Sequence, residues 1–105
     1  GRVRRGSLGV VAQQAPISPA LARALSLAQP FGVWVAGLEP HGPAARAGVR
    51  QGDLLVAADG RPLTGLDDLL RVLGPESIDK TMKLTVVRGE TKQSLTVTPR
   101  ERRQS

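Results

Sequence analysis

The 105-residue sequence contains no cysteine and a single histidine. The absence of cysteine excludes disulfide bonds, thiol nucleophiles and thiolate metal sites. One histidine also excludes a metal site built on several imidazoles, and we expect neither a metal nor another cofactor. The only methionine is Met82. Gly1 is therefore not an initiator residue, and we expect the chain to be a piece of a longer protein.

Aromatic residues are scarce, with only Phe31 and Trp34 present, so the core must be built from leucine, valine and alanine. A hydrophobic fraction of 40% and a net charge of +6 are typical of folded proteins. The length allows one domain. No apolar run approaches the roughly 20 residues of a membrane-spanning helix, and no signal-peptide core is present. The sequence predicts a soluble domain without membrane insertion.

The positive charge is concentrated at the two ends of the chain. Residues 6–99 hold 9 basic and 8 acidic residues and are nearly neutral. We therefore interpret residues 1–5 as a basic linker end, 6–99 as the folded domain and 100–105 as a charged tail. Nucleic-acid binding through the arginine-rich ends is a disfavoured alternative, because no aromatic stacking platform accompanies the charge.

Strand and helix patterns alternate along the chain. The expected elements are a strand at 8–12, a helix from Ser18-Pro19 to Pro30, a strand at 32–38, a short helix at 43–48, a strand at 53–58, a helix at 67–73 and a hairpin over 84–98. This order predicts an α+β, mainly β fold. We expect a small antiparallel partial barrel of five to six strands capped by two or three helices.

The residues needed for catalysis are not arranged for it. His41, the only imidazole, lies in a turn and is expected to be exposed. Asp67 and Asp68 are neighbours on a helix, where adjacent side chains point in different directions. Asp53 and Asp59 bracket a strand as capping and turn residues. The sequence therefore predicts no catalytic residues and no enzyme activity for this chain.

One segment, residues 5–10, has a pattern suited to binding an anion. Gly6 and Gly9 allow successive backbone N–H groups to turn toward one point. The strand that follows, Val10 to Gln13, begins at that point. A C-terminal carboxylate held there would let its peptide pair with the strand edge. A plain turn remains the alternative interpretation of these glycines.

Further motifs extend this pattern. They are Arg-Gly-Ser-Leu-Gly-Val at 5–10, Gly-Val-Trp-Val at 32–35, Gly-Pro-Ala-Ala-Arg-Ala-Gly at 42–48, Gly-Asp-Leu-Leu-Val at 52–56, Asp-Gly-Arg-Pro at 59–62 and Val-Arg-Gly at 87–89. Over nearly its whole length the sequence resembles a PDZ domain. It is most similar to the circularly permuted PDZ domains at the C-terminal end of HtrA/Deg-type trypsin-like serine proteases. The start motif and an extra C-terminal strand, Gln93 to Thr98, point to the protease group.

The resemblance implies a role for each matching residue. The loop that binds the peptide carboxylate would comprise Ser7, Leu8, Gly9 and Val10, with the amides of the last three as donors. The strand that pairs with the peptide would comprise Val11, Ala12 and Gln13.

The helix over 67–73 would form the side of the peptide groove opposite this strand. Leu69 and Leu73 are expected to face the groove, and Leu66 and Leu70 the core. Arg5, directly before the loop, is a candidate for electrostatic attraction of the carboxylate. The small Ser7 differs from the larger residue common in relatives, so side-chain specificity does not transfer.

The function that this resemblance implies is capture of hydrophobic C-termini at micromolar affinity. The partners would be C-termini of peptides or unfolded proteins and the protease domain of the parent chain, without nucleic acid. The domain would recognise substrates for, or regulate, a serine protease in the bacterial periplasm or cell envelope. A scaffold or secretion-system PDZ domain without a protease is the alternative.

Overall fold

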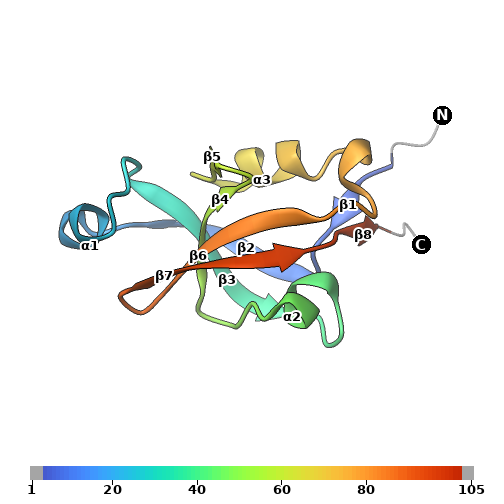
Figure 1. Cartoon of the computed structure of the whole chain (residues 1–105), viewed down its shortest axis with the longest axis horizontal. Helices are drawn as coiled ribbons and strands as arrows, with labels where there is room; N and C mark the ends of the chain where they lie inside the picture. The colour runs from blue at the N-terminus through green and yellow to red at the C-terminus, as the bar shows by residue number, and fades with distance from the viewer. Residues whose placement is uncertain (1–3, 103–105) are drawn as a thin grey trace.

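The computed structural model describes residues 4–102. The elements are β1 (Gly6–Ser7), β2 (Val10–Pro16), α1 (Pro19–Ala24), β3 (Phe31–Leu38), α2 (Pro43–Ala47), β4 (Leu54–Ala58), β5 (Arg61–Pro62), α3 (Leu66–Val72), the 3-10 helix η1 (Pro75–Ser77), β6 (Met82–Arg88), β7 (Thr91–Val97) and β8 (Arg100–Glu101). Figure 1 shows α3 and α2 on opposite sides of the central strands.

The main sheet is antiparallel, with the strand order β2-β3-β4-β6-β7, and β5 pairs with β4 beside it. The edge strands of this order are therefore β2 and β7. A second, two-stranded sheet joins the ends of the described chain, with Gly6 opposite Glu101 and Ser7 opposite Arg100. The prediction of a mainly β, partial-barrel fold is confirmed.

The charge pattern placed residues 100–105 outside the folded domain as a tail. In the structure, residues 100 and 101 of this segment form β8 against β1. The backbone N–H of Arg102 continues the contact by donating to the Arg5 carbonyl at 2.8 Å. In Figure 1 the N- and C-terminal segments consequently lie side by side at one end of the molecule. Residues 1–3 and 103–105 lie outside the described residues.

Two hydrophobic clusters form the core. The larger cluster contains Leu8, Val33, Val35, Ala44, Val49, Leu55, Ala58, Leu63, Leu69, Leu73, Met82, Leu84, Val86 and Val97. The smaller one contains Ile17, Leu54, Val56 and Val87, with side chains of α1 and the segment after it packed on top. Leucine and valine thus supply most of the core, as the scarcity of aromatic residues predicted. Phe31 and Trp34 remain partly exposed.

Local signals in the sequence set several helix boundaries. Ser18 caps α1, its hydroxyl accepting a hydrogen bond from the Leu21 N–H at 3.2 Å. Gly48 ends α2 in the left-handed conformation with φ +100°. The first helix was predicted to continue to Pro30, but it ends at Ala24. Ser26 adopts φ +56°, which turns the chain out of the helix before the proline is reached.

The predicted interpretation of Asp53 as a capping residue was incomplete. Its carboxylate accepts a hydrogen bond from the Arg50 N–H at 2.9 Å. It is also 2% exposed and bound by Arg88. Asp59 does lie in a turn, and accepts a hydrogen bond from the Lys83 N–H at 2.9 Å. Both aspartates thus have structural partners.

No helix within residues 4–102 is both long and apolar enough to cross a membrane.

Candidate ligand groove

The loop between β1 and β2 depends on Gly9. This residue adopts φ +72°, a left-handed conformation that glycine tolerates best. A Cβ atom there would lie 3.2 Å from the Glu39 side chain and 3.5 Å from the Gly42 Cα. The loop therefore requires glycine at position 9, both for its backbone conformation and for its close approach to the segment between β3 and α2.

The carbonyl groups of the loop are fixed on one side. Leu8 O accepts from the Ala44 N–H at 2.9 Å, and Gly9 O accepts from the Glu39 N–H at 2.8 Å. Within residues 4–102, the Leu8 N–H has no hydrogen-bond acceptor. The Gly9 N–H points at the Ser7 hydroxyl, 3.3 Å away. The loop is thus anchored through its carbonyl oxygens, and the Leu8 amide has no acceptor among the described residues.

The exposed edge of β2 carries further available backbone groups. Val10 lies opposite Leu38, and the Glu39-to-Gly9 hydrogen bond flanks this pair. In an antiparallel ladder such a pair turns its own N–H and C=O groups away from the partner strand. The Val10 backbone therefore faces the open side of β2.

A one-residue bulge follows in β3, after which β2 continues in the same alternation. Ala12 lies opposite Val35 and Gln14 opposite Val33, while further along the Ile17 N–H donates to the Pro30 carbonyl at 2.8 Å. That bond shows which residues of β2 are hydrogen-bonded to β3. Ala12 and Gln14 are not among them, so they also direct their backbone groups outward.

The register with β3 adds detail to the predicted pairing strand. Of the three residues expected to pair with a peptide, Ala12 presents its backbone groups at the open edge. Val11 and Gln13 direct theirs to β3, since residues alternate along the strand. The strand boundary was also misplaced, because β2 begins at Val10 and Leu8 is a core residue with 1% exposure.

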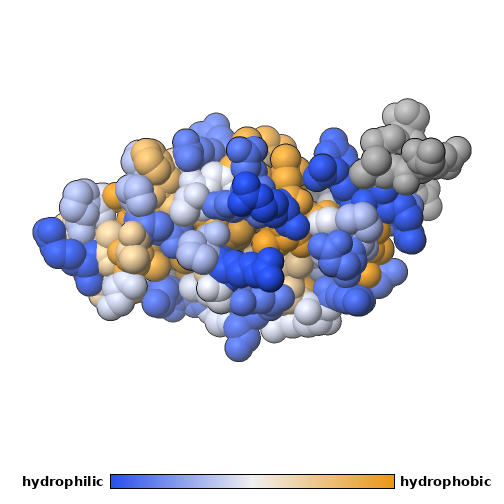
Figure 2. Space-filling view, turned by 90° about the horizontal axis from the view of Figure 1, so that it is seen from above, coloured by the Kyte–Doolittle hydropathy of each residue, from blue (hydrophilic) through white to orange (hydrophobic). Residues whose placement is uncertain are grey.

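Helix α3 runs beside β2, and its orientation reverses the predicted one. Leu69 and Leu73 are 5% and 6% exposed and belong to the core, whereas Leu66 and Leu70 are 43% and 46% exposed. The expectation that Leu66 and Leu70 face the core is wrong. The four leucines form one continuous stripe, so hydropathy alone did not show which edge turns inward. Figure 2, which views the molecule from above Figure 1, shows hydrophobic surface on this face between hydrophilic residues.

Backbone contacts fix this rotation of α3. The Gly6 N–H donates to the Leu73 carbonyl at 2.8 Å and holds the C-terminal end of the helix against β1. At the other end, the Thr64 N–H and hydroxyl both donate to the Asp68 carboxylate, at 2.8 and 2.5 Å. These bonds from Thr64 lower the pKa of Asp68 below its ordinary value.

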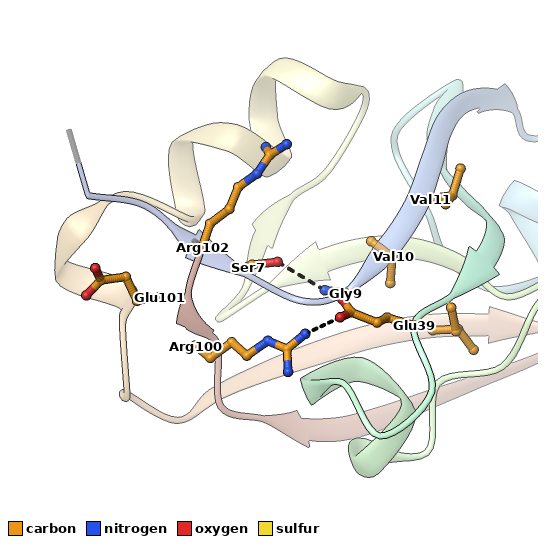
Figure 3. A pocket seen from close by; sticks show the side chains of 9 residues that line it. Ser7, Gly9, Val10, Val11, Glu39, Arg100, Glu101 and Arg102 are labelled. Carbon is orange, nitrogen blue, oxygen red and sulfur yellow. Dashed lines mark hydrogen bonds and ion pairs between the residues drawn. The ribbon is translucent and has the colours of Figure 1, made fainter. Parts of the chain in front are cut away.

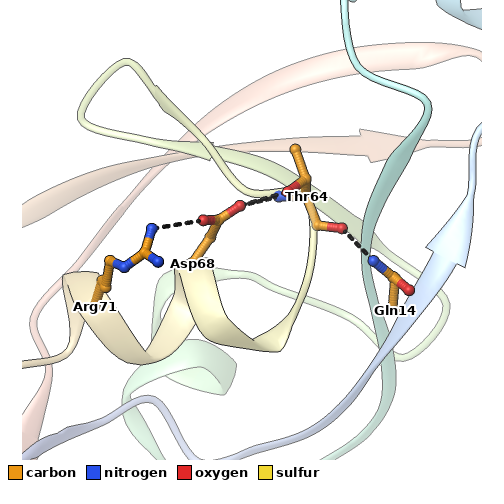
Figure 4. Close-up of polar contacts among 4 residues, drawn as sticks. All are labelled: Gln14, Thr64, Asp68 and Arg71. Carbon is orange, nitrogen blue, oxygen red and sulfur yellow. Dashed lines mark hydrogen bonds and ion pairs between the residues drawn. The ribbon is translucent and has the colours of Figure 1, made fainter.

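The far end of the β2–α3 space is bridged by a side chain. The Gln14 Nε2 donates to the Thr64 carbonyl at 2.9 Å, and so links β2 to the turn before α3 (Figure 4). A hollow of about 420 Å³ surrounds this bridge, lined by both residues together with Gly65 and the first part of α3. The bridge marks the end of the open part of β2.

At the loop end lies a larger hollow of about 830 Å³ (Figure 3). It is lined by Ser7, Gly9, Val10, Val11, Leu38, Glu39, Arg100, Glu101 and Arg102. The prediction had anticipated the loop residues but not the three residues of the C-terminal segment. Their sequence signal was hidden, because a charged run after Pro99 is typical of a solvated tail.

Two other predicted features can be placed. Arg5 is exposed and is not among the residues that line this hollow, so its electrostatic role stays a prediction. His41 is exposed in a turn with φ +63°. Within the described range, no three histidine, aspartate or glutamate side chains are grouped as a metal site.

The chain is similar in sequence to known proteins over most of its length. The chain is 38% identical over 98 residues to a "Probable periplasmic serine endoprotease DegP-like" from Halomonas elongata, which covers 93% of this chain and 20% of that protein. A protein of the same name from Pseudomonas savastanoi has the same identity and coverage. The chain thus spans about a fifth of the length of these relatives.

Solved structures agree in fold. An "HtrA-type protease AlgW with decapeptide" superposes with a TM-score of 0.77 at 28% identity, covering 97% of this chain and 31% of that one. An HtrA3 PDZ domain bound to a phage-derived ligand, FGRWV, gives a TM-score of 0.70 at 26% identity, with 93% and 88% coverage. Residues 6–98 match the family model described as "PDZ domain". The chain therefore belongs to the PDZ domain family, and its matched part is a PDZ domain rather than a protease domain.

Proposed function

We propose that this domain captures hydrophobic C-termini by adding the peptide as a further strand beside β2. The observation that carries the proposal is the continuity between the Leu8 amide, which has no acceptor within residues 4–102, and the outward backbone groups of Val10, Ala12 and Gln14. A peptide running antiparallel to β2 would place its terminal carboxylate at the loop. Two similar solved structures contain a peptide ligand, a decapeptide and FGRWV.

The groove-facing side chains of α3 are Leu66 and Leu70 in this proposal, in place of the buried pair expected from sequence. Their exposed leucine surface suits the apolar side chains of a peptide. Burying one terminal valine or leucine contributes about 1.5 to 3 kcal/mol, and each backbone hydrogen bond adds about 0.5 to 1.5 kcal/mol. Association itself costs roughly 4 to 15 kcal/mol. The gains exceed only the lower end of this cost, so these magnitudes favour weak binding.

In a longer protein the domain would serve an HtrA-like serine protease as its substrate-recognition or regulatory unit, in the periplasm or cell envelope. The names of the DegP-like relatives support this proposal. It predicts that the parent reading frame encodes a trypsin-like Ser-His-Asp domain before residue 1. A parent reading frame without such a domain would favour the scaffold or secretion role instead.

The peptide proposal is tested by isothermal titration calorimetry with hexapeptides ending in valine, as free acids and as C-terminal amides. Charge-assisted hydrogen bonds contribute about 1.5 to 3 kcal/mol each, so the free acid should bind about tenfold or more tightly. A free acid ending in aspartate is the control for the hydrophobic side chain. Equal binding of acid and amide, or no binding across a library of terminal residues, would refute the proposal.

A further inference from the structure

The hollow beside the loop is lined by charged residues of both signs. Its charged lining residues are Glu39, Arg100, Glu101 and Arg102. Arg100 Nη2 pairs with Glu39 Oε1 at 2.6 Å. Glu101 accepts a hydrogen bond from the Nε of Arg4, outside the lining, at 3.0 Å. Within residues 4–102, Arg102 pairs with no carboxylate.

The backbone of Arg102 is fixed next to the loop. Its N–H donates to the Arg5 carbonyl at 2.8 Å, directly after the paired residues of β1 and β8. In Figure 3 the side chain extends from β8 toward α3, away from the Arg100–Glu39 pair below the loop. Arg102 thus lines the same hollow as the loop residues Ser7, Gly9 and Val10.

We propose that Arg102 is the cation that attracts and holds the terminal carboxylate, so that the segment after the last strand of the main sheet completes the ligand site. This inference rests on the proposed function. Backbone amides supply hydrogen bonds but no net charge, whereas a guanidinium stays charged and presents donors that match a carboxylate. The β1–β8 pairing, which positions Arg102, thereby becomes part of the binding site.

The neighbouring arginines are less suited to this role. Arg100 is engaged by Glu39 and Arg4 by Glu101, and Arg5 does not line the hollow. An exposed ion pair contributes little in water, so we expect the loss of Arg102 to weaken binding roughly three- to fivefold. The contribution should fall as salt screens the charge.

The experiment compares the whole chain with its variants Arg102→Ala, Arg102→Lys, Arg5→Ala and Arg23→Ala by titration with valine-terminated hexapeptides. Arg23 is exposed in α1, so Arg23→Ala removes the same charge at a distant site. None of these substitutions alters the backbone bond from residue 102 to Arg5. Arg102→Ala should weaken the free acid three- to fivefold and leave the amide within experimental error. Arg102→Lys should recover part of the loss, and Arg23→Ala should have no effect.

The outcomes separate the two proposals. If the wild-type chain prefers the free acid but Arg102→Ala binds it equally well, the role of Arg102 is refuted while C-terminal recognition stands. If Arg102→Ala weakens acid and amide alike, or if only Arg5→Ala shows the selective loss, the assignment to Arg102 is also refuted. If the wild-type chain does not distinguish acid from amide, the proposed function itself fails. A selective loss that disappears at high salt supports the inference.

Discussion

The guanidinium of Arg88 binds both carboxylate oxygens of Asp53, with Nε 2.9 Å from Oδ1 and Nη2 2.8 Å from Oδ2. Nη2 also donates to the Gly48 carbonyl at 2.8 Å. This arrangement ties the end of β6 to the turn before β4 and to the end of α2. Asp53 is 2% exposed, so its charge depends on these partners.

Replacing Asp53 by asparagine should destabilise the domain by about 2 kcal/mol, because hydrogen bonds to a charged group are weakened while the shape is kept. Denaturant unfolding followed by circular dichroism measures the change. Arg88→Met should be more damaging, since it leaves a buried carboxylate without its partner. Glu90→Gln, in the exposed turn between β6 and β7, is the control and should be neutral. A neutral Asp53→Asn would contradict a stabilising role for the pair.

Acid should remove the contribution of Asp53. Burial alone would raise the pKa of Asp53, but the Arg88 guanidinium and the Arg50 amide outweigh it and hold the pKa below its ordinary value. A lowered pKa stabilises the fold above the unfolded-state pKa of about 3.9. That stability is lost as the pH falls through the lower folded-state value. The difference in unfolding free energy between the wild-type protein and Asp53→Asn should therefore be constant near neutral pH and shrink below about pH 4. A difference independent of pH down to 2 would argue against this.

Gly9→Ala should impair both stability and peptide binding. A left-handed alanine costs about 1 to 2 kcal/mol, and its Cβ would press on Glu39 and move the loop. Gly89→Ala is the matched control, because Gly89 has φ +64° but no atom within 4 Å of an added Cβ. Both variants should lose stability in thermal unfolding, Gly9→Ala more than Gly89→Ala, and only Gly9→Ala should also lose peptide affinity. Unchanged affinity in Gly9→Ala would count against the loop as the carboxylate site.

The two leucine pairs of α3 should behave differently. Leu69→Ala removes a core side chain and should cost about 2 to 5 kcal/mol of stability. Leu70→Ala removes a side chain that is 46% exposed and should cost far less, while weakening the binding of a hydrophobic C-terminus. Paired measurements of unfolding and of peptide titration test this. If Leu70→Ala keeps full affinity, then its side chain does not contact the peptide.

Peptide length should matter only up to the Gln14–Thr64 bridge. At this bridge the side chain of Gln14 crosses from β2 to the turn before α3. A peptide that extends past the bridge must break this hydrogen bond, which is worth about 0.5 to 1.5 kcal/mol. Pentapeptides and decapeptides with the same terminal residues should therefore bind the wild-type chain with similar affinity. In Gln14→Ala the decapeptide should gain. A strong preference of the wild-type chain for the decapeptide would show that the bridge is no barrier.

Patterns that are local in the sequence predicted the fold well. Ser18-Pro19 marked the start of α1, Gly48 the end of α2 and Asp59-Gly60 the turn between β4 and β5. Each depends on one or two residues whose side chain or backbone freedom settles the conformation. The motif order then identified the family correctly.

Features that depend on long-range contacts were not predictable in the same way. The pairing of Gly6 with Glu101 joins residues 95 positions apart. A charged segment carries no sequence pattern that predicts such a pairing. The rotation of α3 required the Thr64–Asp68 and Gly6–Leu73 bonds. The left-handed conformation of Gly9 in the loop between β1 and β2 could be anticipated, because glycine spacing encodes it. The backbone direction along β2 required the register with β3, including its bulge.

The β1–β8 ladder also has a mechanical consequence. Its strands are antiparallel and only two residues long, and the chain leaves both of them in the same direction. A force applied through residues 4 and 102 would load this ladder bond by bond, before it reached the six-stranded sheet. Ser7 is the last residue of the ladder and Leu8 follows it, so complete opening of the ladder would distort the loop. Tension between the flanking segments would then release a bound ligand without unfolding the domain, which force spectroscopy on the peptide complex would detect as dissociation ahead of unfolding.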